Sequence, residues 1–427
     1  MPLPRATGPG FEPYGWAAQA EDVAARHELS PAHVLRFDSN LPPFPAALPA
    51  EARAALSLRA DYPEGTYREL REAAAAYAGC EPDEVTVDAG ADGLIGLVAR
   101  TYLEHGRVAA VQQPTYPLYA IASRIEGAEV AVAPADLDAL PSACPGAAVV
   151  WLCNPANPTG RLLEPAAIAE LADRMPQTVV CVDEAYFEFA DATTAPFAQE
   201  RENLVCVRTL SKAFALAGLR VGYAVSSRTV ARELTDRRAP GPIANLAAAI
   251  GAAALRDPAP ARADASLVCA ERDRLREAFR AAGWDAPDSH ASFVVVRTAD
   301  APRLAPELER RGLVVRGYAD LLRISPRTSA EDDLVLTALG VDPPPAAHHS
   351  SVVFAPAVRV SLALDGRGRA TSRTGDDGRD AGLEARAAAA GWDLEAVADE
   401  GAESAVLEAA LAEAEERARS GAGAAVP

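Results

Sequence analysis

Short apolar runs alternate with amphipathic helical patterns through the first 340 residues of the chain. Before residue 239 this pattern predicts seven strands, most of them apolar enough to be buried on both faces. The predicted strands are 85–87, 108–111, 129–132, 147–152, 178–182, 204–209 and 221–225. Strands separated by helices are typical of a mostly parallel sheet covered by helices on both sides. The sequence therefore predicts an α/β fold.

The pattern changes after the Pro- and Gly-rich turn at 239–242. A long Ala- and Arg-rich helical stretch extends to about residue 283, and a further helix begins near Ser329. Three more strands are expected between these helices, at 293–297, 314–316 and 321–325. We interpret this part as a smaller α+β domain that ends near residue 340.

These changes divide the chain into five expected segments. They are a leader at 1–38 that packs with the small domain, the large domain at 39–238, the small domain at 239–341, a Pro-rich linker at 342–355 and a C-terminal appendage at 356–427 with a disordered end. No window reaches the roughly 18 uninterrupted apolar residues that a membrane helix needs. We therefore expect no membrane-spanning segment.

The compartment is expected to be the cytoplasm. The N-terminal residues lack the apolar core of a secretory signal. The six cysteines form no CxxC pair, and several lie inside apolar runs, which favours buried free thiols over disulfides or a metal site. The formal net charge of −19 disfavours nucleic acid and anionic membranes as partners.

One lysine stands out from the composition. Of the 41 lysines and arginines, Lys212 is the only lysine and the other 40 are arginines. Arginine can replace lysine at most solvated positions, but its guanidinium cannot form a Schiff base. Lys212 is therefore a candidate nucleophilic amine. The alternative is that a biased codon supply simply left one lysine in place.

Polar residues follow the expected strands at the edge where open parallel sheets bind ligands. A Gly-rich turn before a helix suits a phosphate, an aromatic can cover a flat ring, and a carboxylate beside a pyridine nitrogen keeps it protonated. The candidates in chain order are the turn at 88–93, Tyr116, Asn157, Asp183 and Lys212. Each alone has a plain structural reading. Together they are the parts of a pyridoxal phosphate site.

Seven motifs extend this set. They are Tyr62-Pro-Glu-Gly-Thr-Tyr, Gly90-Ala-Asp92, Pro114-Thr-Tyr116, Asn154-Pro-Ala-Asn157-Pro-Thr-Gly, Asp183-Glu-Ala-Tyr186, Thr209-Leu-Ser-Lys212 and Leu322-Arg323-Ile-Ser. With these motifs, the first 340 residues resemble the fold-type I pyridoxal phosphate-dependent aminotransferases, and within them the histidinol-phosphate aminotransferases. The resemblance implies the fold of those enzymes and pyridoxal 5'-phosphate as the cofactor.

The resemblance implies a role for each residue around the cofactor ring. Lys212 would bind the cofactor through a Schiff base and then move the proton between the substrate and the cofactor. Asp183 would pair with the pyridine nitrogen, and Asn157 and Tyr186 would hydrogen-bond the ring oxygen. Tyr116 would stack on the ring.

The resemblance also implies how the phosphate is held. The backbone amides of Ala91 and Asp92 would bind it together with Ser211 and Arg220. Tyr62 would reach the phosphate of a neighbouring subunit. A homodimer is therefore expected.

The substrate side is less closely matched to the family. Arg323 would clamp the carboxylate or phosphate end of the substrate. The family's Asn-Glu-Asn-Pro appears here as Ser39-Asn40-Leu-Pro, without the acidic residue, and its Val-Gly after the clamp becomes Pro326-Arg327. We expect Asn40, Arg323 and Arg327 to contact substrate, with the leader's Arg36 as a further cation.

The expected reaction is amino transfer from a phosphorylated amino donor, histidinol phosphate, to 2-oxoglutarate, giving imidazole acetol phosphate and glutamate in histidine biosynthesis. Three alternatives stay open. The chain could be another aminotransferase, an amino-acid phosphate decarboxylase of the same fold, or a non-catalytic binding protein.

The C-terminal appendage has a resemblance of its own. The runs 358–369 and 391–395 resemble the N-terminal half of imidazoleglycerol-phosphate dehydratase, a histidine-pathway enzyme. That enzyme's Asp-His reads Asp380-Ala381 here, and its Glu-His-His reads Glu400-Gly401-Ala402. Because no histidine follows the linker, we expect a degenerate half-domain without a metal site. An unrelated acidic tail is the alternative.

Overall fold

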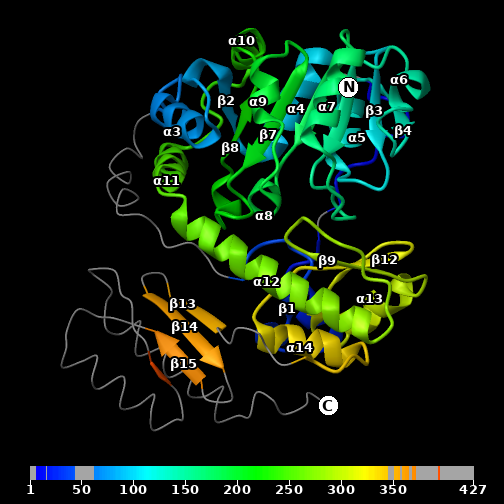
Figure 1. The fold of residues 1–427 in the computed structure, drawn as a ribbon, viewed down its shortest axis with the longest axis vertical. Coiled ribbons are helices and arrows are strands. Elements are labelled where there is room, and N and C mark those ends of the chain that lie inside the picture. Colours follow the sequence, from blue (N-terminus) through cyan, green and yellow to red (C-terminus); the bar gives the residue numbers. More distant parts are fainter. Residues whose placement is uncertain are drawn as a thin grey trace, which may run out of the picture. The chain divides into compact units, whose positions relative to one another are not determined.

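The protein is described by a computed structural model (Figure 1). The described residues are 6–15, 17–43, 62–344, 351–355, 358–364, 368–371 and 393–394. The chain divides into two compact units. The first contains the described parts of 1–17 and 49–265 together with 288–291, and the second contains the described parts of 18–48, 266–287 and 292–427. The domain boundaries expected from the sequence remain a prediction.

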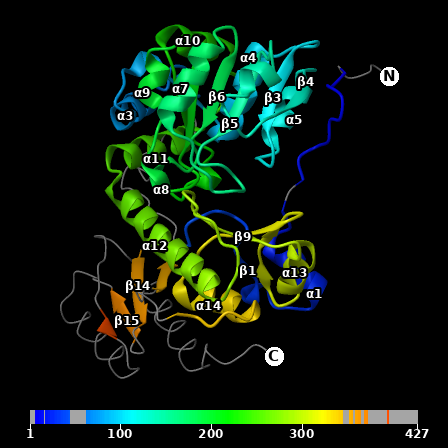
Figure 2. The same ribbon diagram turned by 45° about the vertical axis from the view of Figure 1, so that its right-hand side comes forward.

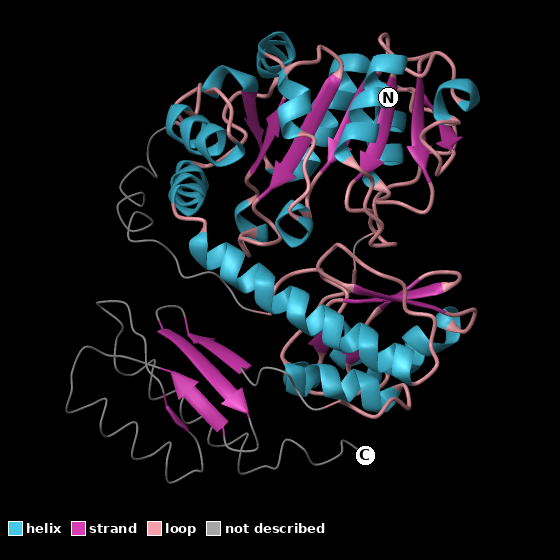
Figure 3. Ribbon diagram, viewed as in Figure 1, coloured by secondary structure: helices cyan, strands magenta, loops and turns pink. Residues whose placement is uncertain are grey.

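The first unit is built on a seven-stranded sheet, whose strands are among the magenta arrows in Figure 3. The order across the sheet is β2 (Val85–Asp88), β8 (Gly222–Val225), β7 (Leu204–Thr209), β6 (Val179–Asp183), β5 (Val149–Cys153), β3 (Val108–Gln112) and β4 (Glu129–Ala133). Only β8 runs antiparallel to its neighbours. The expected mostly parallel α/β sheet is confirmed.

Helices cover both faces of this sheet. Alternate strand residues, among them Val149, Trp151 and Cys153, belong to one core with α4 (Gly90–Tyr102), α5 (Leu118–Ile125) and α10 (Arg228–Arg237). The intervening strand residues are also buried, because α7 (Pro165–Arg174) and α9 (Ala195–Gln199) pack on the sheet as well. Burial on both faces explains why these strands are apolar at almost every position.

The remaining helices of the first unit are short or lie beside the sheet (Figure 2). They are α3 (Arg68–Ala78), α6 (Leu140–Ala143), α8 (Phe187–Ala190), α11 (Asn245–Arg256), and the 3-10 turns Pro82–Glu84 and Ala217–Leu219. α11 packs against α3. The boundary between the units falls within α12 (Ala259–Ala281), after Ala265.

The second unit has its own apolar core around Phe37, Phe279 and Leu322. Its antiparallel sheet has the order β11 (Arg316–Gly317), β12 (Leu321–Ile324) and β9 (Val294–Arg297), and β1 (Leu35–Arg36) pairs in parallel with β10 (Leu313–Val314). The helices are α1 (Ala20–His27), the 3-10 turn Pro31–His33, α13 (Ala301–Glu309) and α14 (Ser329–Ala338). Thr328 and Glu331 form a capping box that fixes the start of α14.

The C-terminal segments form a four-stranded sheet in the order β13 (Ser351–Ala355), β14 (Val358–Leu364), β15 (Gly368–Thr371) and β16 (Asp393–Leu394). The predicted degenerate ligand positions Ala381, Gly401 and Ala402 lie outside the described residues. Among the described helices, none combines the length and the apolar character needed to span a lipid bilayer.

Candidate active site

The carboxyl ends of the strands bring the predicted residues of the first unit to one edge of the sheet. Cys153 at the end of β5 pairs in register with Asp183 at the end of β6. Gly222 of β8 faces Thr209 at the end of β7 and Asp88 at the end of β2. This is the edge at which parallel α/β sheets bind ligands.

Asp183 is a buried carboxylate with only 5% of its surface exposed. The Tyr119 hydroxyl donates to its Oδ2 at 2.7 Å, and the Ala185 backbone N–H donates to its Oδ1 at 3.0 Å. Burial raises the pKa of Asp183 to about 6, although these hydrogen bonds act in the opposite direction. The carboxyl group is therefore fixed in orientation, and it gives up its proton less readily than an exposed aspartic acid.

The role of Tyr119 was missed in the sequence. Its ring is fully buried and stacks on Trp151 with the centroids 5.6 Å apart and the planes 9° apart. The ring of Tyr116 meets it edge-on, with 5.7 Å between the centroids. The sequence carries one signal for Tyr119. It follows Tyr116 by three residues where a helix begins, and residues at this spacing lie side by side on a helix.

Lys212 lies three residues beyond the end of β7, at the same edge. Its Nζ is 5.9 Å from the centroid of the Tyr186 ring, which is buried. The positive charge of Lys212 also acts on Asp183, lowering the pKa of that carboxyl against the effect of burial. The structure thus places Lys212 near both Tyr186 and Asp183.

The start of α4 forms a cradle beside Arg220. Gly90 has φ +74°, and a Cβ there would lie 3.0 Å from Arg220 Nη2. Gly222 allows the helix start to approach β8 closely, because a Cβ on it would lie 2.6 Å from the backbone carbon of Gly90. The first amides of a helix, including those of Ala91 and Asp92, have no intrahelical partner and favour an anion. The cradle suits a phosphate.

The side chain of Asp92 holds two predicted residues at this cradle. Arg220 Nη2 donates to Asp92 Oδ2 at 2.7 Å, and the Tyr116 hydroxyl donates to Oδ1 at 3.1 Å. Nearby, the Ser211 backbone N–H donates to Thr209 Oγ1 at 3.2 Å, and the two hydroxyl oxygens are 2.9 Å apart. Sequence reasoning used only the backbone of Asp92 and did not anticipate that its carboxylate positions the arginine.

Asn157 lies in a turn that is fixed by Asn154. The Leu163 backbone N–H donates to Asn154 Oδ1 at 2.7 Å, and Asn154 Nδ2 donates to the Leu163 carbonyl at 3.0 Å. The backbone N–H of Asn157 bonds the thiol of Cys153, the neighbour of Asp183 in the sheet. Asn157 is therefore linked to Cys153, the residue that pairs with Asp183 in the sheet.

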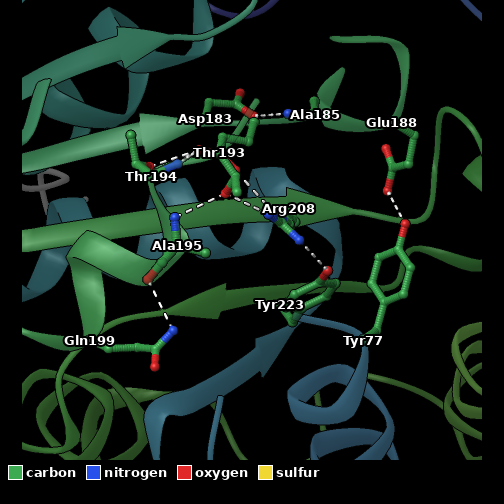
Figure 4. A network of polar contacts seen from close by, with 11 residues as sticks. Tyr77, Asp183, Ala185, Glu188, Thr193, Thr194, Ala195, Gln199, Arg208 and Tyr223 are labelled. Atoms are coloured by element: carbon green, nitrogen blue, oxygen red, sulfur yellow. Dashed lines mark hydrogen bonds and ion pairs between the residues drawn. The ribbon is translucent and has the colours of Figure 1, made fainter. Parts of the chain in front are cut away.

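A buried ion pair supports the turn from Asp183 to Tyr186 on the other face of the sheet (Figure 4). Arg208 Nε donates to Glu184 Oε2 at 3.2 Å, with both side chains at most 3% exposed. Arg208 also donates from Nη2 to Thr193 Oγ1 at 2.6 Å, and its guanidinium carbon is 3.7 Å from the centroid of the Phe187 ring. This network was not predicted, because it depends on a pairing between β6 and β7.

Glu188 is a partly buried acid in the same region (Figure 4). The Tyr77 hydroxyl donates to its Oε1 at 3.4 Å. Burial raises the pKa of Glu188 to about 7, while the positive charge of Arg208 acts in the opposite direction. Glu188 therefore changes charge close to neutral pH.

Tyr62 differs from all the other predicted residues in its exposure. Its side chain is 98% exposed, whereas Tyr116 and Tyr186 are partly or fully buried.

The predicted substrate residues all lie in the second unit. Arg323 Nη2 donates to the Asp38 carbonyl at 2.7 Å, and the guanidinium is mostly buried. The Asn40 backbone N–H donates to Ser325 Oγ at 2.9 Å, and Ser325 donates back to Asn40 Oδ1 at the same distance. Asn40 therefore anchors the segment that follows the leader to Ser325, directly after β12, a positioning role that the sequence did not reveal.

The two further arginines are both engaged by acids. Arg327 Nη2 donates to Glu331 Oε1 at 3.1 Å. Arg36 makes a two-pronged pair with Asp38, at 2.7 and 3.0 Å. A phosphate bound here would share these guanidinium groups with the carboxylates, which an arginine with five donors permits.

Within the part of the chain that the structure describes, no group of three or more His, Cys, Asp or Glu residues is arranged to hold a metal ion.

The family model of aminotransferase class I and II matches residues 32–339. A histidinol-phosphate aminotransferase from Symbiobacterium thermophilum is 35% identical over 350 residues, which cover 77% of this chain and 95% of that protein. One from Geobacillus thermodenitrificans is 32% identical over 349 residues, with the same coverage. The crystal structure of histidinol-phosphate aminotransferase from Sinorhizobium meliloti in complex with pyridoxal-5'-phosphate is similar with a TM-score of 0.70 and 26% identity, covering 76% of this chain and 94% of that one.

Proposed function

The chain belongs to the class I and II aminotransferases, and from this premise we propose that it transfers the amino group of histidinol phosphate to 2-oxoglutarate. Relatives of that name share 32% and 35% of their residues with it over most of their length. The observation that carries the proposal is the convergence of Lys212, Asp183 and the Gly90 cradle at one edge of the sheet.

The residues at this edge fit pyridoxal phosphate, the cofactor of this enzyme class. The fit rests on the donor set and on the cradle. A buried carboxylate suits a protonated ring nitrogen, and the α4 amides with Arg220 suit a dianionic phosphate. The space beside Arg220 is one that a Cβ on Gly90 would fill. Lys212 is the one side chain of this sequence that can attach to the cofactor's carbonyl carbon.

When bound, pyridoxal phosphate supplies a ring that withdraws electrons from the substrate carbon bearing the amino group. Lys212 Nζ would hold the cofactor between turnovers and would then take the proton from that carbon as a base. Asp183 would keep the ring nitrogen protonated, because its carboxylate favours the charged form. Tyr116 would cover the ring, and Asn157 and Tyr186 would bond the ring oxygen.

We assign the phosphate of the cofactor to the amides of Ala91 and Asp92 together with Ser211 and Arg220. Tyr62 would complete the phosphate site of a second copy, which makes the enzyme a homodimer. The exposure of the Tyr62 side chain, at 98%, supports this assignment. Sedimentation of the purified protein at micromolar concentration should give a dimer, and a monomer with full activity would contradict it.

We place the enzyme in the cytoplasm. All six cysteines are free thiols, and Cys153, Cys181 and Cys206 are buried. Buried free thiols suit a reducing compartment.

We propose that Arg323 binds the acidic end of each substrate in turn, with Asn40 beside it and Arg327 as an additional cation for the phosphate. Guanidinium groups bind phosphate and carboxylate through two parallel hydrogen bonds, which makes them suited to both substrates. The arginines also supply local positive charge on a chain whose net charge is −19.

A panel of amino donors tests the substrate. The full-length enzyme with added cofactor would be assayed with 2-oxoglutarate and either histidinol phosphate, histidinol, histidine or aspartate. We expect kcat/KM for histidinol phosphate to exceed that for histidinol by roughly 30-fold or more, since a lost charged partner costs about 2 to 5 kcal/mol. Equal use of both would contradict the substrate. Release of carbon dioxide from an amino-acid phosphate, without amino transfer, would favour the decarboxylase alternative.

A further inference from the structure

Tyr119 makes a direct contact with the carboxylate that serves the cofactor ring. Its hydroxyl donates to Asp183 Oδ2 at 2.7 Å, while the Ala185 N–H takes Oδ1. The Tyr119 side chain is fully buried, and Asp183 is 5% exposed. Each carboxylate oxygen therefore keeps one hydrogen bond from the protein and further lone pairs for a ligand.

The ring of Tyr119 is fixed independently of this hydrogen bond. It stacks on Trp151, and the indole Nε1 of Trp151 donates to Ser123 Oγ at 3.1 Å. The Ser123 hydroxyl in turn donates to the Tyr119 backbone carbonyl at 2.7 Å. The hydroxyl of Tyr119 is thus held in place by α5 and β5 before any ligand binds.

Asp183 needs such a partner because its surroundings are unfavourable for a charge. It faces Tyr119 from α5, Cys153 from β5, Asp92 from α4 and Lys212 beyond β7, and Cys181 precedes it on β6. Burial and the negative charge of Asp92 favour the protonated acid, whereas Tyr119 and Lys212 favour the carboxylate. A Lys212 joined to the cofactor no longer carries the charge of a free ammonium group, which leaves the Tyr119 hydroxyl and the Ala185 backbone N–H as the neutral donors that persist.

The phenol of Tyr119 also remains a hydrogen-bond donor over the whole working pH range of the enzyme. Burial raises its pKa well above the usual value, so its hydroxyl stays protonated at any pH at which the enzyme works. A neutral hydroxyl that cannot ionise adds no competing charge beside Asp183.

We propose that Tyr119 is a positioning residue that holds Asp183 as an oriented carboxylate for the cofactor's ring nitrogen. This inference rests on the proposed function, because it takes Asp183 as the partner of that nitrogen. Tyr119 acts on the cofactor through Asp183.

The test measures the unfolding equilibrium of the cofactor-free protein by urea at pH 5 and pH 8, for the wild type and Tyr119→Phe. The folded-state pKa of Asp183, about 6, lies above its ordinary 3.8, so stability is lost as the pH rises through 6. In Tyr119→Phe, which lacks the hydroxyl, the pKa of Asp183 in the folded protein rises further, so this variant loses more stability at pH 8 than the wild type does. A hydrogen bond to a charged group is worth about 1.5 to 3 kcal/mol, so we expect the unfolding constant to increase about tenfold or more at pH 8 beyond its change at pH 5.

Two controls separate this effect from loss of packing. Tyr102→Phe removes the hydroxyl of a partly buried tyrosine at the end of α4, which donates to Glu233 Oε2 of α10 at 3.1 Å, and should change stability equally at both pH values. In an Asp183→Asn background, Tyr119→Phe should lose its pH dependence. In the enzyme with bound cofactor, the acidic limb of the pH profile of kcat/KM should shift upward by about one pH unit in Tyr119→Phe.

An equal loss of stability at both pH values, or a pH dependence that survives in Asp183→Asn, would overturn the proposal. Failure of Tyr119→Phe to fold at pH 5, where Asp183 is mostly protonated, would overturn it as well, since the hydroxyl would then serve packing alone. No donor enters the urea measurement. A failed donor panel would therefore refute the substrate and leave this result intact.

Discussion

Gly222→Ala tests the close approach of α4 to the sheet at the phosphate cradle. A Cβ on Gly222 would lie 2.6 Å from the backbone carbon of Gly90 and 2.9 Å from the Ala91 nitrogen. Because backbone atoms cannot rotate away, the start of α4 must retreat by about 0.8 Å to restore an ordinary 3.4 Å contact. A hydrogen bond of about 2.9 Å from a backbone amide of α4 to the cofactor phosphate would then lengthen beyond about 3.5 Å and be lost. Each lost bond to a phosphate costs about 1.5 to 3 kcal/mol, so the Kd for the cofactor should rise roughly 10- to 150-fold.

The assay is a fluorescence titration of the cofactor-free protein with pyridoxal phosphate, together with urea unfolding. Gly96→Ala is the matched control, since it lies within the same helix and a Cβ there meets nothing within 4 Å. The control should keep its cofactor affinity and gain about 0.5 to 1 kcal/mol of stability. Gly222→Ala should also lose about 1 to 3 kcal/mol from overpacking. A Kd for Gly222→Ala within twofold of the wild type would refute the reasoning.

Three further predictions concern charges. The pKa of Glu188 is about 7 in the folded protein against its ordinary 4.5, so the wild type loses stability as the pH rises from 5 to 8. Glu188→Gln should lose roughly 3 kcal/mol less than the wild type over this range in urea unfolding. Equal losses of stability in the two proteins would contradict this. Asp183→Asn should retain its circular dichroism but lose turnover at least about 100-fold, since a neutral amide cannot stabilise the protonated ring nitrogen; substantial residual turnover would remove Asp183 from this role. Arg323→Ala should weaken both histidinol phosphate and 2-oxoglutarate by about 2 to 5 kcal/mol in kcat/KM, whereas Arg327→Ala should weaken mainly the phosphorylated donor; equal effects of Arg327→Ala on both substrates would count against its assignment.

The sheet was predictable because its strands are apolar throughout and its helices separate them regularly. All seven predicted strands are present, with ends shifted by at most two residues, as at 147–152 for Val149–Cys153. Asp183 and Lys212 could be recognised because one ends a buried strand and the other follows a buried strand by three residues, where a charged group indicates a function.

The partners of these residues could not be predicted, because they come from other elements. Tyr119 reads as core in the sequence, and only the packing of α5 on β5 and β6 places its hydroxyl against Asp183. The pairing of Arg208 with Glu184 depends on the alignment of β6 with β7. Gly222 carries no local turn signal, since its need for a small side chain arises from the helix start against it.

The central claim is that Lys212 is the amine through which this aminotransferase binds its cofactor. Borohydride reduction of the loaded enzyme, followed by peptide mass spectrometry, measures this directly, because Lys212 is the only lysine in the chain. We expect the reduced cofactor on the one peptide that contains Lys212, and neither label nor turnover in Lys212→Arg. Label confined to the N-terminal amine, or turnover retained by Lys212→Arg, would contradict it.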